Sequence, residues 1–338
     1  MEIILVYDSG YDRIINLKNT ENMKRILTLA IAIMASTSFI CSAENGFVIN
    51  NCPVTPVRQE PSEVSEQVTQ LLFGEVCELV ERRSSWAKIR STIDGQEGWV
   101  SYKMMIPVDQ KEAINLLGER QKAKVDGTVA VPMAVATDMQ TGEKRMLTIG
   151  TRLSNYTNGT FEVFGKQYQI DPACVYSLEF IGERLEDPSL QDGFKDAYKV
   201  LVNGKEVKGE DVVHVAKQLL NVSYLWGGKN MMGYDCSGFT QTVYSVFGIN
   251  LLRNAREQVT QGEEVNSLAE SQPGDLVFFD HADRDPKATR ITHVGMLISP
   301  TEVIHCSGCV HVDRIDENGI HLANGEMTHH LAKIKRYL

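Results

Sequence analysis

The chain has 338 residues, of which 43% are hydrophobic and 7% aromatic, and its formal net charge at pH 7 is −10. The length predicts two or three domains, and the composition is typical of a globular protein and excludes a wholly disordered one. The acidic balance argues against nucleic acid as a partner, because binding to phosphates requires a basic surface.

Residues 1–43 have the pattern of a secretory signal peptide. From Met23 the chain reads MKRILTLAIAIMASTSFICSA, in which a basic pair precedes an apolar run and small residues end at Ala43. We expect the true start at Met23 and cleavage after Ala43, with a lipid anchor on Cys41 as the alternative. The apolar run is too short to predict a membrane span, so the mature chain is expected to have no integral span. The signal peptide predicts export, to the periplasm or outside the cell.

Residues 47–107 alternate short β-rich runs with glycine-bearing or charged turns. A long first loop, a Phe-Gly-Glu turn and two strands around Trp86 and Trp99 follow one another. This order resembles the bacterial SH3-like domain, a small β-barrel whose groove takes peptide or cell-wall ligands. We expect the two tryptophans to pack the barrel, with stacking on a ligand as the alternative.

Residues 108–126 read as a helical linker, and residues 127–182 return to strand patterning. The pieces TIGTRL and GTFEVFGKQYQI resemble a second, more divergent SH3-like barrel without the tryptophan landmarks. A polar link around Glu183–Lys199 is expected to end this unit.

Residues 205–338 predict a domain of helices followed by an antiparallel sheet. An amphipathic helix at 209–222 precedes a glycine-rich turn and a second helix that begins near Cys236. Four strand-like runs and a short terminal one come after, which is the order of an α+β domain.

Cys236 lies in the stretch GYDCSGF, where that second helix begins. It precedes a buried stripe that starts at Phe239, so one interpretation is a small hydrophobic residue of the core. The other is a nucleophile, because a thiol in the first helical turn faces free N–H groups and the positive end of the helix dipole. Asp235 can cap this helix, and Ser237 keeps the approach to the thiol uncrowded.

A thiolate needs a proton acceptor and donor, and two histidines on successive strands can supply it. In ITHVGMLI, alternation places His293 and Gly295 on one face, and twelve residues later EVIHCSG carries His305. Strands joined by a short turn pair with each other, so we expect the two imidazoles to lie together. His305 would then hold the tautomer of His293, while a satisfied core histidine remains the alternative for each.

The residues of this region resemble the NlpC-type cysteine peptidases of bacterial cell walls, which have a papain-like fold. Five stretches in the right order carry the resemblance: YLWGG, DCSGF, PGDLVFF, THVGM and IHCSG. It implies that Cys236 is the nucleophile, His293 the general base and acid, and His305 the orienting third member. It also implies that the Tyr224 hydroxyl and the Cys236 backbone N–H hold the oxyanion.

The fold expected for the whole chain is therefore an α+β papain-like catalytic domain preceded by two all-β SH3-like barrels. The resemblance implies cleavage of the γ-D-glutamyl–diamino acid bond in peptidoglycan stem peptides that have a free N-terminal L-Ala. Asp235 and Ser237 would bind the α-ammonium and nearby polar groups of the dipeptide, and the first barrel would close one end of the cleft and add an acidic and an aromatic side chain. The candidates for these are Glu63, Glu66 and Tyr102, and the alternative is that they are ordinary surface residues of the barrel.

Two other classes of function remain open. In one, the SH3-like domains bind cell wall and catalysis is vestigial; in the other, the same fold carries an amidase or acyltransferase. The intact set of one cysteine and two histidines, with Tyr224 upstream, favours the peptidase.

The chain carries further cysteines and histidines besides Cys236 and His293. His305, Cys306, Cys309 and His311 form H-C-x2-C-x-H, which could suggest zinc, but neighbouring residues on a strand alternate faces and no second ligand pair follows. We expect no metal and no cofactor, and either a local disulfide or two free thiols. Cys52 and Cys77 either pair or lie in the core, and His321, His329 and His330 are expected at the surface.

Overall fold

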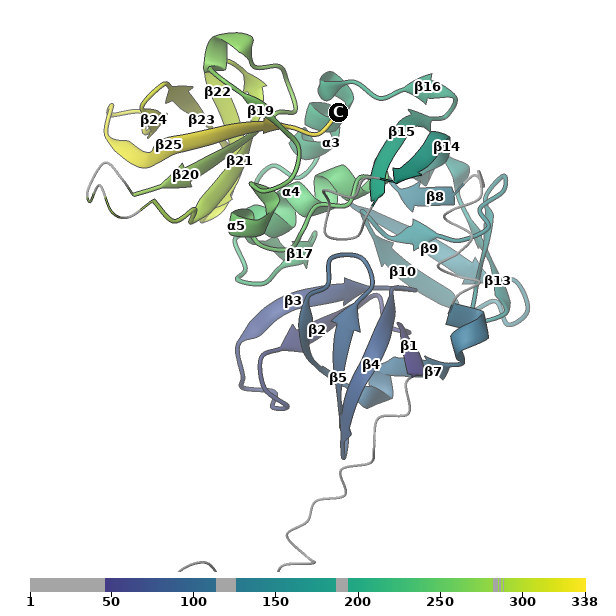
Figure 1. The fold of residues 1–338 in the computed structure, drawn as a ribbon. Helices are drawn as coiled ribbons and strands as arrows, with labels where there is room; N and C mark the ends of the chain where they lie inside the picture. Colours follow the sequence, from purple (N-terminus) through teal and green to yellow (C-terminus); the bar gives the residue numbers. More distant parts are fainter. Residues whose placement is uncertain (1–45, 114–125, 187–193, 282–284, 286, 288) are drawn as a thin grey trace, which may run out of the picture. The chain divides into compact units, whose positions relative to one another are not determined.

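The fold is shown by a computed structural model that describes residues 46–113, 126–186, 194–281, 285, 287 and 289–338 (Figure 1). The predicted signal peptide and most of the predicted linker lie outside these residues; of the linker, residues 110–113 are helical. Within the described ranges, no helix combines the length and the apolar character needed to cross a membrane.

The first unit is an all-β sheet of seven antiparallel strands in the order β3-β2-β6-β5-β4-β1-β7. Their bounds are β1 (Gly46–Asn50), β2 (Val54–Arg58), β3 (Gln67–Leu72), β4 (Val76–Arg83), β5 (Trp86–Ser91), β6 (Glu97–Ser101) and β7 (Met105–Val108). Alternation sends Val48, Val57 and Ile89 into one fully buried cluster, as expected for strands with one face on a core. The barrel expected over residues 47–107 coincides with this sheet.

The second unit consists of a four-stranded sheet, β10-β9-β13-β12, and a five-stranded sheet, β11-β8-β14-β15-β16. Their bounds are β8 (Asp126–Val129), β9 (Met133–Asp138), β10 (Lys144–Thr148), β11 (Arg152–Leu153), β12 (Thr160–Val163), β13 (Lys166–Ile170), β14 (Val175–Glu186), β15 (Phe194–Val202) and β16 (Lys205–Glu206). Leu147, Phe161 and Tyr168 lie in its core. The all-β character expected for residues 127–182 is present; a second SH3-like barrel remains a prediction.

The boundary predicted for this unit is wrong. Strand β14 continues past residue 182 and pairs with β15 from Leu178 opposite Val202 to Glu186 opposite Phe194. The supposed polar link therefore contains two paired strands, and residues 205–206, assigned to the next domain, pair with β15 as well. Backbone hydrogen bonds hold such a ladder, so the strands form without the apolar alternation on which the prediction relied.

The third unit has helices α3 (Gly209–Lys217), α4 (Cys236–Ser245) and α5 (Ala255–Gln258) before a seven-stranded antiparallel sheet. The strand order is β19-β25-β20-β21-β22-β23-β24, with a further pairing of β25 to β24. The strands are β19 (Glu263–Val265), β20 (Leu276–Asp280), β21 (His293–Ser299), β22 (Glu302–Ser307), β23 (Cys309–Asp316), β24 (Gly319–His321) and β25 (Met327–Arg336). Helices followed by an antiparallel sheet were expected, but β25 has ten residues and is not short.

Helices α3 and α4 cover one face of this sheet. Phe239, Val243 and Phe247, the stripe predicted for α4, are fully or almost fully buried against Val294 and Met296 of β21. Burial of such side chains contributes about 1.5–3 kcal/mol each. The stripe therefore fixes the start of α4, and with it Cys236, beside β21.

The first β unit is attached to the third through buried polar contacts. Lys229 Nζ lies 3.0 Å from Glu75 Oε1, with 9% and 10% of the two side chains exposed. The Lys229 backbone N–H donates to Gln70 Oε1 at 2.9 Å, and Arg253 Nε donates to Thr69 Oγ1 at 2.8 Å. Because groups buried in this way must keep their partners, the end of β3 is held against the turn that precedes α4.

Candidate active site

Cys236 is the first residue of α4, and Asp235 caps the helix, as predicted. The Asp235 carboxylate accepts the backbone N–H of Gly238 at 2.6 Å. Gly238 allows a close approach here, since a Cβ at this position would lie 2.0 Å from the carbonyl oxygen of Gly228. The DCSG sequence therefore fits the helix end tightly under the glycine-rich turn.

The surroundings of Cys236 disfavour an isolated thiolate. Burial raises the pKa of the Cys236 thiol to about 11, and the Asp235 charge adds to this, while the backbone N–H groups of Val294 and Ser237 oppose it. Burial, followed by the neighbouring histidines, lowers the pKa of His293 well below its usual range. Thiolate and imidazolium are both disfavoured alone, so transfer of the thiol proton to His293 creates the two charges together.

His293 and His305 lie together, which confirms the predicted proximity of the two imidazoles. His293 Nε2 is 2.8 Å from His305 Nδ1. The contact is diagonal, because His305 pairs across the sheet with Gly295 and not with His293. Gly295 makes room for it, since a Cβ there would lie 3.0 Å from the Cβ of His305.

A carboxylate that the sequence analysis did not identify determines which nitrogens carry protons. Asp313 Oδ2 lies 3.1 Å from His305 Nε2, and a carboxylate can only accept, so His305 Nε2 donates. Burial lowers the pKa of His305 and keeps the ring neutral, so its Nδ1 accepts from His293 Nε2–H. Nδ1 of His293 is then the unprotonated nitrogen, as a general base for Cys236 requires.

Asp313 is ionised in this arrangement. Its hydrogen bond from His305 is the main cause that lowers the pKa of the carboxyl group below its usual range. Asp313 follows His311 by two residues on β23, so alternation places both side chains on the same face of the sheet. This spacing is the sequence signal from which Asp313 could have been predicted as a site residue.

His329, predicted at the surface, is half-buried and packs against His293 and His305. Its ring centroid lies 4.4 Å from that of His293 and 5.8 Å from that of Phe279. The prediction was wrong because β25 is a long strand that returns beside β20. His330 on the same strand contacts Asp280, with Nδ1 2.7 Å from Oδ1.

Tyr224 lies in the same cleft as Cys236 and is half-buried. Burial, followed by the nearby Cys236 and Asp235, raises the pKa of its hydroxyl group. The raised pKa keeps the proton on the hydroxyl group, so that it can donate a hydrogen bond, which an oxyanion partner requires.

Asp235 and Ser237 line the cleft, but the structure gives Asp235 an additional structural role. Its two oxygens accept from Arg253 Nη1 at 3.0 Å and Arg253 Nη2 at 2.6 Å, and also from the Gly227 and Gly238 N–H groups. A carboxylate offers about four lone-pair directions, so these donors saturate it. Arg253 also donates to Ser237 Oγ at 3.1 Å, and the sequence analysis did not single it out.

The cleft has a volume of about 1150 Å³ and is lined by both the first β unit and the third unit. Glu66 lines it and is exposed, and its Oε1 accepts from Trp226 Nε1 at 2.7 Å. Among the described residues that line this cleft, the other two candidates from the barrel, Glu63 and Tyr102, do not occur. The Tyr102 ring instead lies under the Arg82 guanidinium, 3.3 Å from its carbon.

The six cysteines within the described ranges are free thiols, so neither disulfide alternative is formed there. Cys306 is fully buried and donates to the Tyr234 carbonyl oxygen at 3.1 Å. It lies on the opposite face of β22 from His305, as alternation requires, so the H-C-x2-C-x-H residues do not all converge.

Comparison with protein families places two known domains in the chain. Residues 221–334 match the NlpC/P60 family, and residues 53–105 match the bacterial SH3 domain. These are the two families that the sequence motifs resemble, and each match falls inside the range expected for it.

Two curated relatives are gamma-D-glutamyl-L-lysine dipeptidyl-peptidases. The one from Bacillus cereus is 36% identical over 96 residues, which are 28% of this chain and 28% of that protein. The one from Bacillus subtilis is 33% identical over 106 residues, which are 31% of this chain and 34% of that protein. The matched region thus spans about a third or less of the length of these relatives.

Solved structures support the fold over a longer range. An NlpC/P60 family protein from Bacillus cereus aligns with a TM-score of 0.65 and 19% identity, covering 86% of this chain and 99% of that one. An NlpC/P60 endopeptidase from Photobacterium damselae aligns with a TM-score of 0.51 and 16% identity, covering 88% of this chain and 72% of that one. At these identities the likeness concerns the fold alone.

Proposed function

We propose that this chain, in which an NlpC/P60 domain follows a bacterial SH3 domain, is an exported cysteine peptidase acting on peptidoglycan stem peptides. The bond hydrolysed is the one between γ-D-glutamate and a diamino acid, in peptides with a free N-terminal L-Ala. The observation that carries the proposal is the chain of contacts Asp313–His305–His293, whose last member, His293, lines the same cleft as Cys236 at a helix N-terminus.

The geometry supports a two-step reaction. Cys236 Sγ attacks the γ-carbonyl carbon and its proton passes to His293 Nδ1, while Tyr224 and the Cys236 backbone N–H hold the oxyanion. The C–N bond then breaks as His293 protonates the leaving amine, which leaves a thioester on Cys236. Water attacks the thioester with His293 as base, the C–S bond breaks, and the thiol recovers its proton. No metal or cofactor takes part in these steps.

The first β unit favours short substrates with a free amine. Glu66 is held at the cleft by Trp226, whose indole donates to it, and an ammonium group is the natural partner of this exposed carboxylate. Because Asp235 is saturated by Arg253 and two backbone donors, Glu66 replaces it as the proposed ammonium partner. Arg256 and Arg290, which also line the cleft, supply positive charge for the α-carboxylates of the stem peptide. A released muropeptide, as in recycling or turnover, fits this cleft.

The substrate assignment predicts a specific effect of Glu66→Gln. The full chain should cleave the tripeptide L-Ala-γ-D-Glu-diamino acid but not its N-acetylated form. Glu66→Gln keeps an oxygen for Trp226 and removes the charge, so kcat/KM for the free tripeptide should fall roughly ten- to a hundredfold, mainly through KM. Glu63→Gln, three residues away and outside the cleft, is the matched control and should leave kcat/KM unchanged.

Other results of this assay would favour other functions. Cleavage of neither peptide would contradict the proposed peptidase and favour a wall-binding protein. Equal cleavage of both would leave a peptidase, or an amidase on the same fold, without a free-amine requirement.

Asp313 is predicted to act on catalysis by positioning protons, without contact to the substrate. In Asp313→Asn the amide can donate to His305, which would move the ring protons of His305 and His293 to the other nitrogens. The kcat should fall about 10²- to 10⁴-fold with KM nearly unchanged, by analogy with a carboxylate that orients a catalytic imidazole directly. ¹⁵N chemical shifts of His293 report which nitrogen is protonated, and an unchanged tautomer in the variant would contradict this role.

A further inference from the structure

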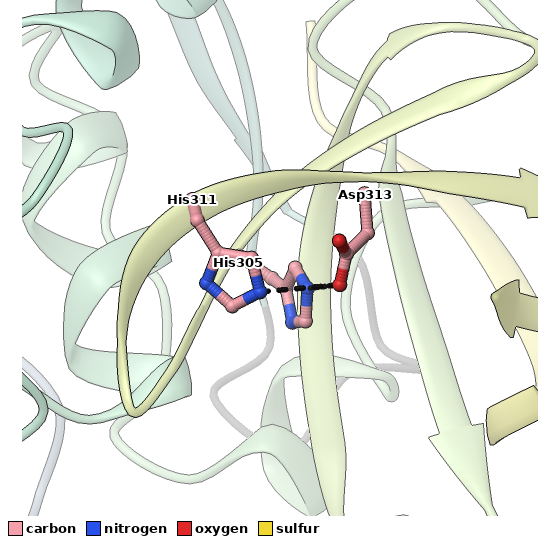
Figure 2. Close-up of side chains that lie close together, drawn as sticks. All are labelled: His305, His311 and Asp313. Carbon is pink, nitrogen blue, oxygen red and sulfur yellow. Dashed lines mark hydrogen bonds and ion pairs between the residues drawn. The ribbon is translucent and has the colours of Figure 1, made fainter. Parts of the chain in front are cut away.

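Three side chains converge on β22 and β23, and one of them, His305, also contacts His293. His305 lies directly opposite His311 in the sheet, and Asp313 follows on the same face of β23. Figure 2 shows both rings directed at the same carboxylate oxygen. We propose that His305, His311 and Asp313 form a binding site for a divalent transition metal such as Zn²⁺, and that metal bound there inhibits the enzyme.

The separations match a metal site. One ligand atom from each residue lies within 4.8 Å of the others, and Asp313 Oδ2 is 3.1 Å from His305 Nε2 and from His311 Nε2. A tetrahedral zinc with bonds of about 2.0–2.1 Å to nitrogen and oxygen separates neighbouring ligand atoms by roughly 3.3 Å. The two histidine nitrogens need to move away from the Asp313 oxygen by only a few tenths of an ångström, and water can take the fourth position.

The surroundings orient the ligands as metal sites do. The Cys309 carbonyl oxygen can only accept, so His311 Nδ1 donates to it at 2.8 Å, which leaves Nε2 for the metal. The His311 and Asp313 side chains are 33% and 18% exposed, whereas His305 is 1% exposed, so an ion can enter from the side of His311. Two imidazoles with one carboxylate favour zinc, copper or nickel over magnesium or calcium.

Metal at this site would reverse the protons of the catalytic pair. His305 Nε2 gives its proton to solvent and binds the metal with its lone pair. The proton that His293 Nε2 shares with His305 Nδ1 then passes to Nδ1, and His293 regains a proton from solvent on its own Nδ1. The number of protons on this pair is unchanged, but His293 Nδ1 now carries one and cannot accept the proton of Cys236. This inhibition rests on the proposed peptidase mechanism, whereas the binding site itself does not.

The binding site is tested by titration of the full chain with Co²⁺, followed by its absorption spectrum, and by calorimetry with Zn²⁺. We expect one ion per chain, retained in Cys236→Ala and in His321→Ala, a matched histidine control on β24. His311→Ala should weaken binding at least about tenfold, because one of three ligands is lost. Asp313→Asn, which keeps the side-chain volume, should weaken it as well, so that misfolding of one variant does not decide the result. Loss of binding in Cys236→Ala, unchanged binding in His311→Ala, or no binding at all would overturn the site.

The inhibition is tested with the same tripeptide. Zn²⁺ should inhibit the unsubstituted chain, and a chelator should restore the rate. In His311→Ala, inhibition should require at least about tenfold more Zn²⁺, measured relative to that variant's own metal-free rate. Equal sensitivity of this variant would overturn the inhibitory role and assign inhibition to the thiol. If the unsubstituted chain does not cleave the tripeptide in the absence of metal, the proposed peptidase is contradicted. The metal titrations would then still test whether the binding site exists.

Discussion

Replacement of Cys236 by alanine is expected to lower cleavage of the L-Ala-γ-D-Glu-diamino acid tripeptide by at least about 10⁴-fold. The reason is that alanine removes the only protein atom that, in the proposed mechanism, forms a covalent bond to the γ-carbonyl carbon of the substrate. Binding should survive, because Tyr224 and Glu66, which line the same cleft, are untouched. The measurement is kcat from single-turnover cleavage, with substrate affinity from calorimetry.

Cys309→Ala provides the matched control. Cys309 is a free thiol at the start of β23 and does not line the cleft in the described part of the chain. Its substitution should leave kcat within about twofold of the original. Acid quenching of the unsubstituted enzyme should also trap an L-Ala-γ-D-Glu adduct on Cys236, detected by mass. Cleavage that survives Cys236→Ala, or an adduct on another residue, would refute the thiol mechanism.

Replacement of Asp235 by asparagine is expected to destabilise the fold by about 3–5 kcal/mol, because it leaves a buried arginine without its counter-charge. The Arg253 side chain is 1% exposed and is paired with both oxygens of Asp235. Asparagine is also a good helix cap, so the loss would report on the charge and not on the cap of α4. The measurement is the midpoint and slope of urea unfolding, followed by tryptophan fluorescence.

Removal of both charges separates this explanation from a general packing defect. The double variant Asp235→Asn with Arg253→Met should be more stable than Asp235→Asn alone, because no charge is then left buried without a partner. If Arg253→Met lowers the free energy of unfolding as much in the Asp235→Asn background as it does alone, the two changes are independent. That result would contradict a dominant charge effect.

The sequence was most informative where the chemistry is local. The N-cap at Asp235 and the helix that starts at Cys236 depend on a few consecutive residues, and both were predicted correctly. The proximity of His293 and His305 was also predictable, because a short turn between two apolar strands leaves few ways to pair them. The motifs likewise identified the two domain families that the comparisons confirm.

The sequence was least informative where partners are distant along the chain or where strands lack apolar alternation. The β14–β15 hairpin was taken for a link because backbone pairing leaves no mark in its composition. His329 was placed at the surface because nothing local shows that β25 returns beside β20. No local signal predicts the partners of Arg253 either, because it pairs with Asp235, eighteen residues earlier, and with Thr69 of the barrel.

By itself, then, the sequence determined the helix that starts at Cys236, the proposed nucleophile, and the proximity of the two histidines, because these depend on short spacings and on the period of helix and strand. Only the tertiary structure decided which carboxylate orients the histidines, how Asp235 is neutralised and which barrel residue reaches the cleft. Glu66 lies there and Glu63 does not, although both belong to the same loop. Such choices depend on how separate strands and loops meet, and each involves polar contacts between residues that only the folded chain brings together.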